Sequence, residues 1–262
     1  MKAATAVETA DTTHKGLYVL GGAAALIAGL VFRRNLGPEV SLLSGQMPPD
    51  MTIGWFTLLQ QNRLLGLALL NVFDIVDYAL VGLMFIALYV VLKQSHESKA
   101  LIALVLGLIG IAVYFASNTA FSLLSLSDQY AAATTDAQRS TLLAAGQTML
   151  SMYNPGTVYQ GTGIYLSFLL VAVAGLVISI AMLRSKFFGR TTAYVGILAS
   201  VLDLGYCLAV IIAPGATLTV IGTLFVASAG LLLMIWHILI GLRLLQMGGI
   251  GLPSLKKRTV YG

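Results

Sequence analysis

The chain has 262 residues, of which 58% are hydrophobic and 10% are charged, and its mean hydropathy is +0.91. Soluble domains carry about 25% charged residues, so this composition excludes a single compact domain in water and favours lipid as the solvent. The net charge of +5 does not indicate nucleic-acid binding, because no basic run is interleaved with exposed aromatic residues.

Six apolar runs approach the length that a helix needs to cross a hydrocarbon core about 30 Å thick, which is about 20 residues. In chain order these runs cover residues 16–32, 70–92, 100–124, 158–183, 193–213 and 218–242. The sequence therefore predicts an all-α integral membrane protein, a bundle of six transmembrane helices in one domain spanning residues 1–262. Residues 1–15 are predicted to be a polar tail and residues 246–262 a basic tail, and the first apolar run is predicted to be a retained helix rather than a removed signal peptide.

The first run carries small residues on one helix face. Gly21, Ala25 and Gly29 have the small-xxx-small spacing that lets two helix backbones approach closely. Packing inside one protomer is the preferred interpretation. The alternative is a homodimer, or a complex with another membrane protein, formed through this face.

Two long connections are predicted on the side of the membrane opposite the termini. Residues 34–69 are expected to contain an interfacial helix with Trp55 at the depth of the lipid headgroups. In residues 125–157, Thr135 and Gln138 have the spacing of a capping box, which predicts the start of a second helix. We expect this helix to lie along the outer surface.

The basic residues indicate the orientation of the spans. Eleven of the fifteen Lys and Arg residues fall in the two tails or in the second–third and fourth–fifth connections. The other four, on the opposite side, are Arg33, Arg34, Arg63 and Arg139. Because cytoplasmic loops collect basic residues, both termini are predicted to lie in the cytoplasm and the protein in the plasma membrane.

Polar side chains within the spans are the candidate functional residues, because inserting a charged one costs about 2.5–3.5 kcal/mol. The first candidates for a ligand or ion pathway are Asp74, Asp77, Asn118 and Asp203. The second are Asn71, Tyr114, Tyr206 and His237. No Lys or Arg lies deep in a predicted span, so the acids must be solvated, protonated and hydrogen-bonded, or neutralised by a cation.

Asp74 and Asp77 stand at positions i and i+3 of one helix, and helical rise places them with Asn118 in the outer third of the bilayer. One interpretation is an outward-opening pocket that binds a cation or a polar ligand. The other is that the aspartates are neutralised by an arginine at the same level: Arg33, Arg34 or Arg63.

Asp203 is predicted near the midplane, where a structural, hydrogen-bonded aspartate and a proton- or ion-handling aspartate remain equal alternatives. His237 is predicted to be a core or interfacial histidine, because no second His, Cys or Glu stands at metal spacing, so no metal site and no cofactor are expected. Phosphate-binding loops, His-Glu-x-x-His pairs and Gly-x-Ser-x-Gly elbows are absent from the sequence, which disfavours the common enzyme classes.

Four stretches resemble the bacterial family catalogued as domain of unknown function 4386. They are Asp74-Ile-Val-Asp-Tyr-Ala-Leu-Val-Gly, Tyr114-Phe-Ala-Ser-Asn-Thr-Ala-Phe-Ser, Gly161-Thr-Gly-Ile-Tyr and Thr192-Ala-Tyr-Val-Gly-Ile-Leu-Ala. The resemblance runs from the first span to about Leu245. It implies a multi-helix membrane protein of the bacterial inner membrane, and it transfers no activity and no catalytic residue.

The leading functional hypothesis is a non-enzymatic transporter-like, sensory or accessory protein. Its outward-facing pocket would have Asp74, Asp77 and Asn118 at the mouth and Asp203 at the floor. The first alternative is an intramembrane enzyme that acts on a lipid or quinone, with Asp203 or Asp74 as general acid and base. The second is a structural subunit that buries the small-residue face of the first span against a partner.

Overall fold

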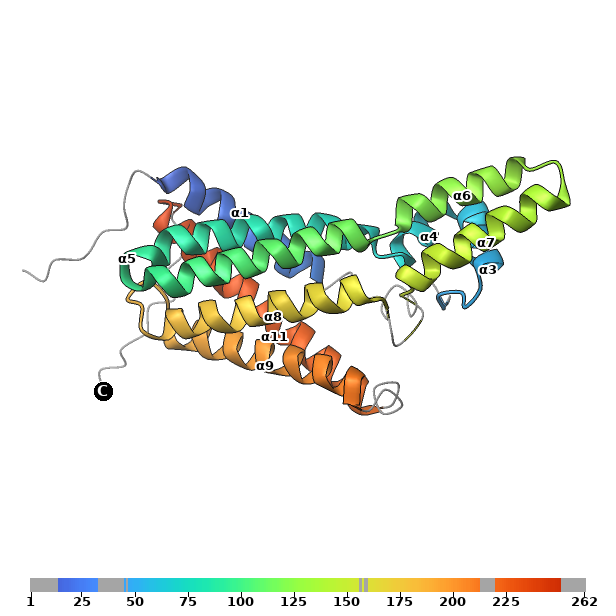
Figure 1. Ribbon diagram of the computed structural model, residues 1–262. Coiled ribbons are helices and arrows are strands. Elements are labelled where there is room, and N and C mark those ends of the chain that lie inside the picture. Colours follow the sequence, from blue (N-terminus) through green and yellow to red (C-terminus); the bar gives the residue numbers. More distant parts are fainter. Residues whose placement is uncertain are drawn as a thin grey trace, which may run out of the picture.

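The computed structural model describes residues 14–32, 45, 47–155, 157, 160–212 and 220–250, and every regular element among them is a helix. These helices are α1 (Lys15–Phe32), α3 (Thr52–Gln61), α4 (Arg63–Leu69), α5 (Val72–Ser117), α6 (Ala120–Ala132), α7 (Asp136–Met152), α8 (Thr162–Leu183), α9 (Arg190–Ile212) and α11 (Val220–Met247). Figure 1 shows them in two groups, a bundle of α1, α5, α8, α9 and α11, and a smaller group of α3, α4, α6 and α7 beyond one end of it. We call the smaller group the cap.

Among the described residues, four stretches are long and apolar enough to cross a membrane: Val72–Ala132, Thr162–Leu183, Arg190–Ile212 and Ala227–Met247. The apolar part of α1 is shorter. The first of the four is bent, because His96 leaves helical geometry at φ −145° and ψ 54°. The residues of α5 before and after His96 therefore form two limbs that run side by side in opposite directions (Figure 1).

The bundle helices pack in a closed cycle. α1 lies against α5 and α11, α11 against α9, α9 against α8, and α8 against α5. The first limb of α5 supplies much of the buried surface, including Tyr78, Met84, Phe85 and Leu88. This order of neighbours leaves the first limb of α5, α8, α9 and α11 facing one interior space.

The small residues of α1 are used inside the protomer. A Cβ at Gly21 would lie 2.2 Å from Cβ of Ala87 on α5, and one at Gly29 would lie 3.2 Å from Cβ of His237 on α11. Ala25 between them is fully buried. The alternative of a dimer face at Gly21, Ala25 and Gly29 is therefore wrong, because α5 and α11 already cover this face.

The cap has its own hydrophobic core, in which Trp55 and Phe56 of α3 pack with Leu123 of α6 and Leu150 of α7. Trp55 is 0% exposed, so protein rather than lipid surrounds its side chain, and its position at the depth of the lipid headgroups stays a prediction. Its helix has an apolar face, as an interfacial helix would, but α6 and α7 cover that face in place of lipid.

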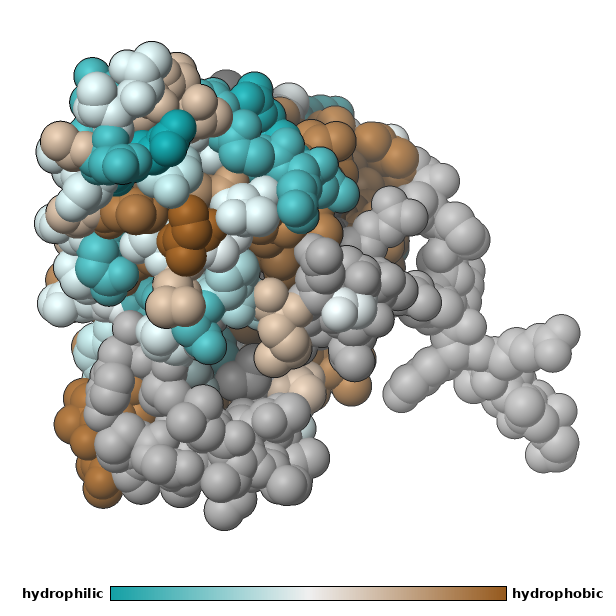
Figure 2. All heavy atoms as spheres, turned by 90° about the vertical axis from the view of Figure 1, so that its right-hand side faces the viewer, coloured by the Kyte–Doolittle hydropathy of each residue, from teal (hydrophilic) through white to brown (hydrophobic). Residues whose placement is uncertain are grey.

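The capping box at the start of α7 is confirmed. Thr135 Oγ1 accepts a hydrogen bond from the Gln138 backbone N–H at 3.2 Å, and Gln138 Oε1 accepts one from the Thr135 N–H at 3.3 Å. α6 and α7 extend away from the bundle instead of lying across its end, in contrast to the expectation from the sequence (Figure 1). Figure 2 views this end of the molecule and shows hydrophilic side chains spread over much of the cap.

Candidate functional site

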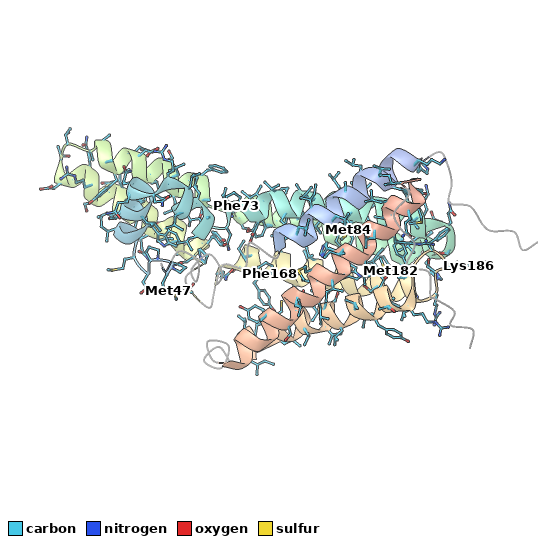
Figure 3. The ribbon with its side chains drawn as sticks, turned by 180° about the vertical axis from the view of Figure 1, so that it is seen from behind. Met47, Phe73, Met84, Phe168, Met182 and Lys186 are labelled. Atoms are coloured by element: carbon cyan, nitrogen blue, oxygen red, sulfur yellow. The ribbon has the colours of Figure 1, made fainter. Side chains whose placement is uncertain are left out.

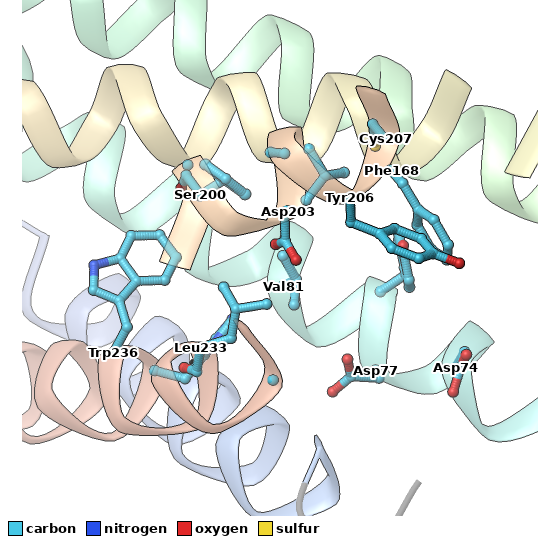
Figure 4. Close-up of a pocket in the computed structure, with 17 residues that line it drawn as sticks. Asp74, Asp77, Val81, Phe168, Ser200, Asp203, Tyr206, Cys207, Leu233 and Trp236 are labelled. Atoms are coloured by element: carbon cyan, nitrogen blue, oxygen red, sulfur yellow. Dashed lines mark hydrogen bonds between the residues drawn. The ribbon is translucent and has the colours of Figure 1, made fainter. Parts of the chain in front are cut away.

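A cavity of about 210 Å³ occupies the interior space between the first limb of α5, α8, α9 and α11. All three aspartates singled out from the sequence line it: Asp74 and Asp77 from α5, and Asp203 from α9. Figure 4 shows the carboxyl groups of Asp77 and Asp203 directed into the space between the helices, with Asp74 one helical turn beyond Asp77. The structure thus gathers acids from two helices that lie far apart in the sequence.

The remaining walls of the cavity are mostly apolar and aromatic. The aromatic side chains that line it are Tyr78, Phe85, Phe168, Tyr206 and Trp236. Of these five, only Tyr206 is a candidate site residue from the sequence, although Tyr78 follows Asp77 directly on α5. The others lie in apolar runs, where an aromatic residue that lines a cavity looks the same as one that packs in the core.

Asp77 is the most deeply buried of the acids. Asp77 is 4% exposed. Its Oδ1 atom has no hydrogen-bond partner among the described residues. A buried polar oxygen without a partner is costly, typically by about 1–3 kcal/mol, and therefore needs an explanation such as a bound water, ion or ligand.

No Lys or Arg in the described part of the chain forms an ion pair with the cavity acids. Arg63 instead pairs with Asp128 at 2.7 Å, and Arg139 lies 3.7 Å from Asp136, both on the cap. The interpretation that Arg63 neutralises Asp74 and Asp77 is therefore wrong. Arg33 and Arg34, the other arginines considered for this role, lie outside the described residues.

Asp74 is held by the second limb of α5. The Tyr114 hydroxyl donates to Oδ2 of Asp74 at 3.2 Å and also lies 3.4 Å from the Asn71 carbonyl oxygen. The Tyr114 ring stacks on Tyr78, with 4.1 Å between ring centroids and 7° between planes. These contacts fix the mouth of the cavity nearest the cap.

Asn118 and Asn71 hold the joints between the bundle and the cap. Asn118 Nδ2 donates to the carbonyl oxygens of Leu70 at 3.3 Å and Asn71 at 3.4 Å, while its Oδ1 accepts from the Ala120 N–H at 3.0 Å. Asn71 itself has φ 55°, a left-handed conformation that asparagine tolerates better than most residues. Among the first candidates, Asn118 thus lies beside the cavity and is not one of its described lining residues.

Asp203 and His237 lie deeper in the bundle. None of the hydrogen bonds found among the described residues fixes the Asp203 carboxyl group, and Tyr206 follows it one turn later on α9. His237 is 2% exposed, and its Nδ1 lies 2.7 Å from the Leu233 carbonyl oxygen, which can only accept a hydrogen. His237 is therefore a buried histidine, as expected, but it also borders the cavity.

The carboxyl groups are spread around the cavity walls and do not converge. In the described part of the chain, no group of three His, Cys, Asp or Glu side chains is close enough to hold a metal ion. The cavity combines separated acidic groups with aromatic faces, an arrangement that suits a ligand larger than a bare ion.

Comparison with known proteins gives one match. A protein family described as "Domain of unknown function (DUF4386)" has a sequence model that matches residues 15–248. This range contains all of the described helices and hence all residues around the cavity. No curated protein and no solved structure matches the chain.

Proposed function

The chain belongs to the DUF4386 family, and because the description of that family assigns no activity, we propose a function from the cavity itself. The protein is a non-enzymatic, transporter-like membrane protein that binds a compact organic cation between α5, α8, α9 and α11. The observation that carries this proposal is a set of three acids in an aromatic cavity, none of which forms an ion pair with a Lys or Arg of the described residues.

The proposed membrane topology has six transmembrane helices: α1, the two limbs of α5, α8, α9 and α11. The 18 residues of α1 give a length of about 27 Å at 1.5 Å per residue, close to the thickness of the hydrocarbon core. The positive-inside rule places the cap outside, since the basic residues of the bundle lie at its other end, where Figure 3 labels Lys186. These residues are Lys15, Lys93, Lys99, Arg184, Lys186, Arg190 and Arg243.

Cysteine labelling tests this topology. In a Cys207→Ser background, Thr141→Cys on the cap is expected to react with a membrane-impermeant maleimide in right-side-out vesicles and not in inside-out vesicles. Ser98→Cys, at the bend of α5, is expected to show the reverse pattern. Both positions are exposed, so burial does not prevent labelling. Labelling of both positions from the same side would contradict the six-span arrangement.

The chemistry of the walls supports an organic cation as the ligand. Carboxyl groups supply the opposite charge, and aromatic faces attract cations by about 0.5–2 kcal/mol each when water is excluded. Cavities for drug-sized ligands have volumes of about 300–1,000 Å³. At about 210 Å³, this cavity fits a more compact molecule, such as a small quaternary or primary amine.

Because the three carboxyl groups are buried, binding of the cation is coupled to the release of protons. Without a cation, protonation is the least costly way to keep three carboxyl groups in an apolar interior. A cation that enters therefore displaces protons from the carboxyl groups, and its affinity is expected to rise with pH. Such an exchange is the elementary step of a proton-linked transporter.

Tryptophan fluorescence provides the direct test. The chain has two tryptophans, and Trp55→Phe leaves only Trp236, which lines the cavity. Titration of the purified protein with tetramethylammonium or choline is expected to give a saturable change in Trp236 emission. The neutral isostere 3,3-dimethylbutan-1-ol is the matched control and is expected to give none. Equal responses to choline and to this alcohol, or no response to any cation, would contradict the proposal.

A further inference from the structure

A second pocket lies next to the acidic cavity, where α8 begins and α9 ends. Its volume is about 320 Å³, and its walls come from Ser151 at the end of α7, Thr162 and Tyr165 at the start of α8, and Val210 on α9. No carboxyl group is among its described lining residues. We call it the outer pocket, because it lies at the cap end of the bundle.

Two aromatic side chains separate the outer pocket from the acidic cavity. Phe168 of α8 and Tyr206 of α9 line both spaces. The two helices pack directly against each other, so these side chains come from facing surfaces. Figure 4 shows both of them on the side of the cavity away from Trp236, with Asp203 in between.

Phe168 and Tyr206 make fewer hydrogen bonds and ring contacts among the described residues than Tyr114 does. Tyr114 is fixed by a hydrogen bond to Asp74 and by stacking on Tyr78. By contrast, the Tyr206 hydroxyl makes none of the hydrogen bonds found among the described residues, and neither Tyr206 nor Phe168 takes part in one of the ring contacts found there. Both residues are only half-buried. Rotation of either side chain would therefore break no polar contact within the described part of the chain.

The outer pocket and the acidic cavity differ in the chemical groups that could bind a cation. The outer pocket has the hydroxyl groups of Thr162 and Tyr165 and an aromatic face, whereas the inner cavity adds three carboxyl groups. Neutral oxygens and aromatic faces bind a cation weakly, and buried carboxylates bind it more strongly. A cation would therefore gain affinity by moving inward.

We propose that the outer pocket is the loading site for the cation and that Phe168 and Tyr206 form the gate through which it enters the acidic cavity. This inference rests on the proposed cation-binding function and adds the route of entry. The gate side chains are positioned to close the passage behind the cation, since both already line the inner cavity.

The single cysteine of the chain reports on this gate. Cys207 lines the acidic cavity, is 2% exposed and is not among the described residues of the outer pocket. The cationic reagent 2-aminoethyl methanethiosulfonate forms a mixed disulfide with an accessible cysteine and releases methanesulfinate. The rate of this reaction at Cys207, measured on the full chain in lipid nanodiscs, measures passage through the gate.

Phe168→Ala and Tyr206→Ala are each expected to raise the rate of Cys207 modification about tenfold, as a lower steric barrier would. Phe168→Leu is expected to raise it less, and it provides a second variant if Phe168→Ala does not fold. Leu166→Ala, at a position on α8 that is 40% exposed, is the matched control. Equal rates in all of these variants would overturn the gate.

Stopped-flow measurement of Trp236 emission separates this inference from the proposed function. A gate controls entry and exit alike, so Phe168→Ala is expected to raise the association and dissociation rates of tetramethylammonium together. A rise in the dissociation rate alone would make Phe168 a wall of the binding site and would overturn the gate. Absence of any cation response in the protein with intact Phe168 and Tyr206 would instead reject the proposed function.

Discussion

Asp77→Asn is expected to weaken the binding of tetramethylammonium about 30-fold or more while leaving the folded protein as stable as before, or more stable. Removing one partner of a buried charge pair costs about 2–5 kcal/mol, and 1.4 kcal/mol corresponds to a factor of ten in affinity. The free energy of unfolding is expected to fall little, because Asp77 Oδ1 has no hydrogen-bond partner among the described residues. A neutral amide also replaces a carboxyl group that is protonated when no cation is bound, so the substitution buries no additional charge.

Titration of Trp236 fluorescence and thermal unfolding of the same samples check both halves of this prediction. Asp203→Asn is expected to behave in the same way. Asp128→Asn is the matched control, because Asp128 is an exposed aspartate of the cap that pairs with Arg63 at 2.7 Å. The affinity of wild type should fall as the pH is lowered, because protons compete with the cation for the carboxyl groups, and this dependence should weaken in both cavity variants. An unstable Asp77→Asn protein that binds the cation normally would make Asp77 structural.

Gly196→Ala is expected to destabilise the protein by about 1–3 kcal/mol, the usual cost of inserting a methyl group into a well-packed core. A Cβ at Gly196 would lie 2.2 Å from both Ser179 Oγ and Trp236 Nε1. Ser179 and Trp236 are themselves buried, so neither can move away freely. The clash outweighs the gain of about 1 kcal/mol that alanine has over glycine within a helix.

This substitution tests whether α8, α9 and α11 meet as closely as described. Thermal unfolding is expected to shift to lower temperature, and Trp236 emission is expected to change because the indole must move. Gly16→Ala is the matched control, since a Cβ there would meet nothing within 4 Å. A Gly196→Ala protein with wild-type stability and emission would show that the three helices are packed more loosely.

Several of the long apolar helices could be predicted because lipid imposes a minimum length on each apolar run. The predicted run of residues 158–183 corresponds to α8 (Thr162–Leu183), and that of residues 193–213 corresponds to α9 (Arg190–Ile212). The capping box of α7 was equally readable, because its hydrogen bonds join residues three positions apart. In each case the physical cause is local to the segment.

Features that depend on distant contacts could not be predicted in this way. The run of residues 100–124 looked continuous, but it is broken at Asn118, whose amide bonds to carbonyl groups more than forty residues earlier. Trp55 lies on a helix with an apolar face, and such a face does not reveal whether lipid or protein covers it. The structure shows that other cap helices cover it.

The same distinction applies to the site. The cost of burying charge was enough to select Asp74, Asp77 and Asp203 as candidates, and the structure places all three around one cavity. Depth along the spans also suggested Asn118, but depth does not fix the direction of a side chain, and Asn118 turns to the α4–α5 joint. The order in which the helices pack decides which side chains face the cavity. The spacing of apolar residues along a single helix does not reveal this order.

The joints between bundle and cap have a mechanical consequence. Both limbs of α5 run on into the cap, one through Asn71 and the other through Asn118, and hydrogen bonds tie these two points together. The cap is thus joined to the hairpin at two linked points, and α7 alone has 17 residues, a lever arm of about 25 Å. A tilt of α5 by about 5° would displace the far end of such a lever arm by about 2 Å. Since Tyr114 bonds both to Asp74 and to the Asn71 carbonyl oxygen at this joint, a change at the Asp74 carboxyl group is expected to alter the position of the cap.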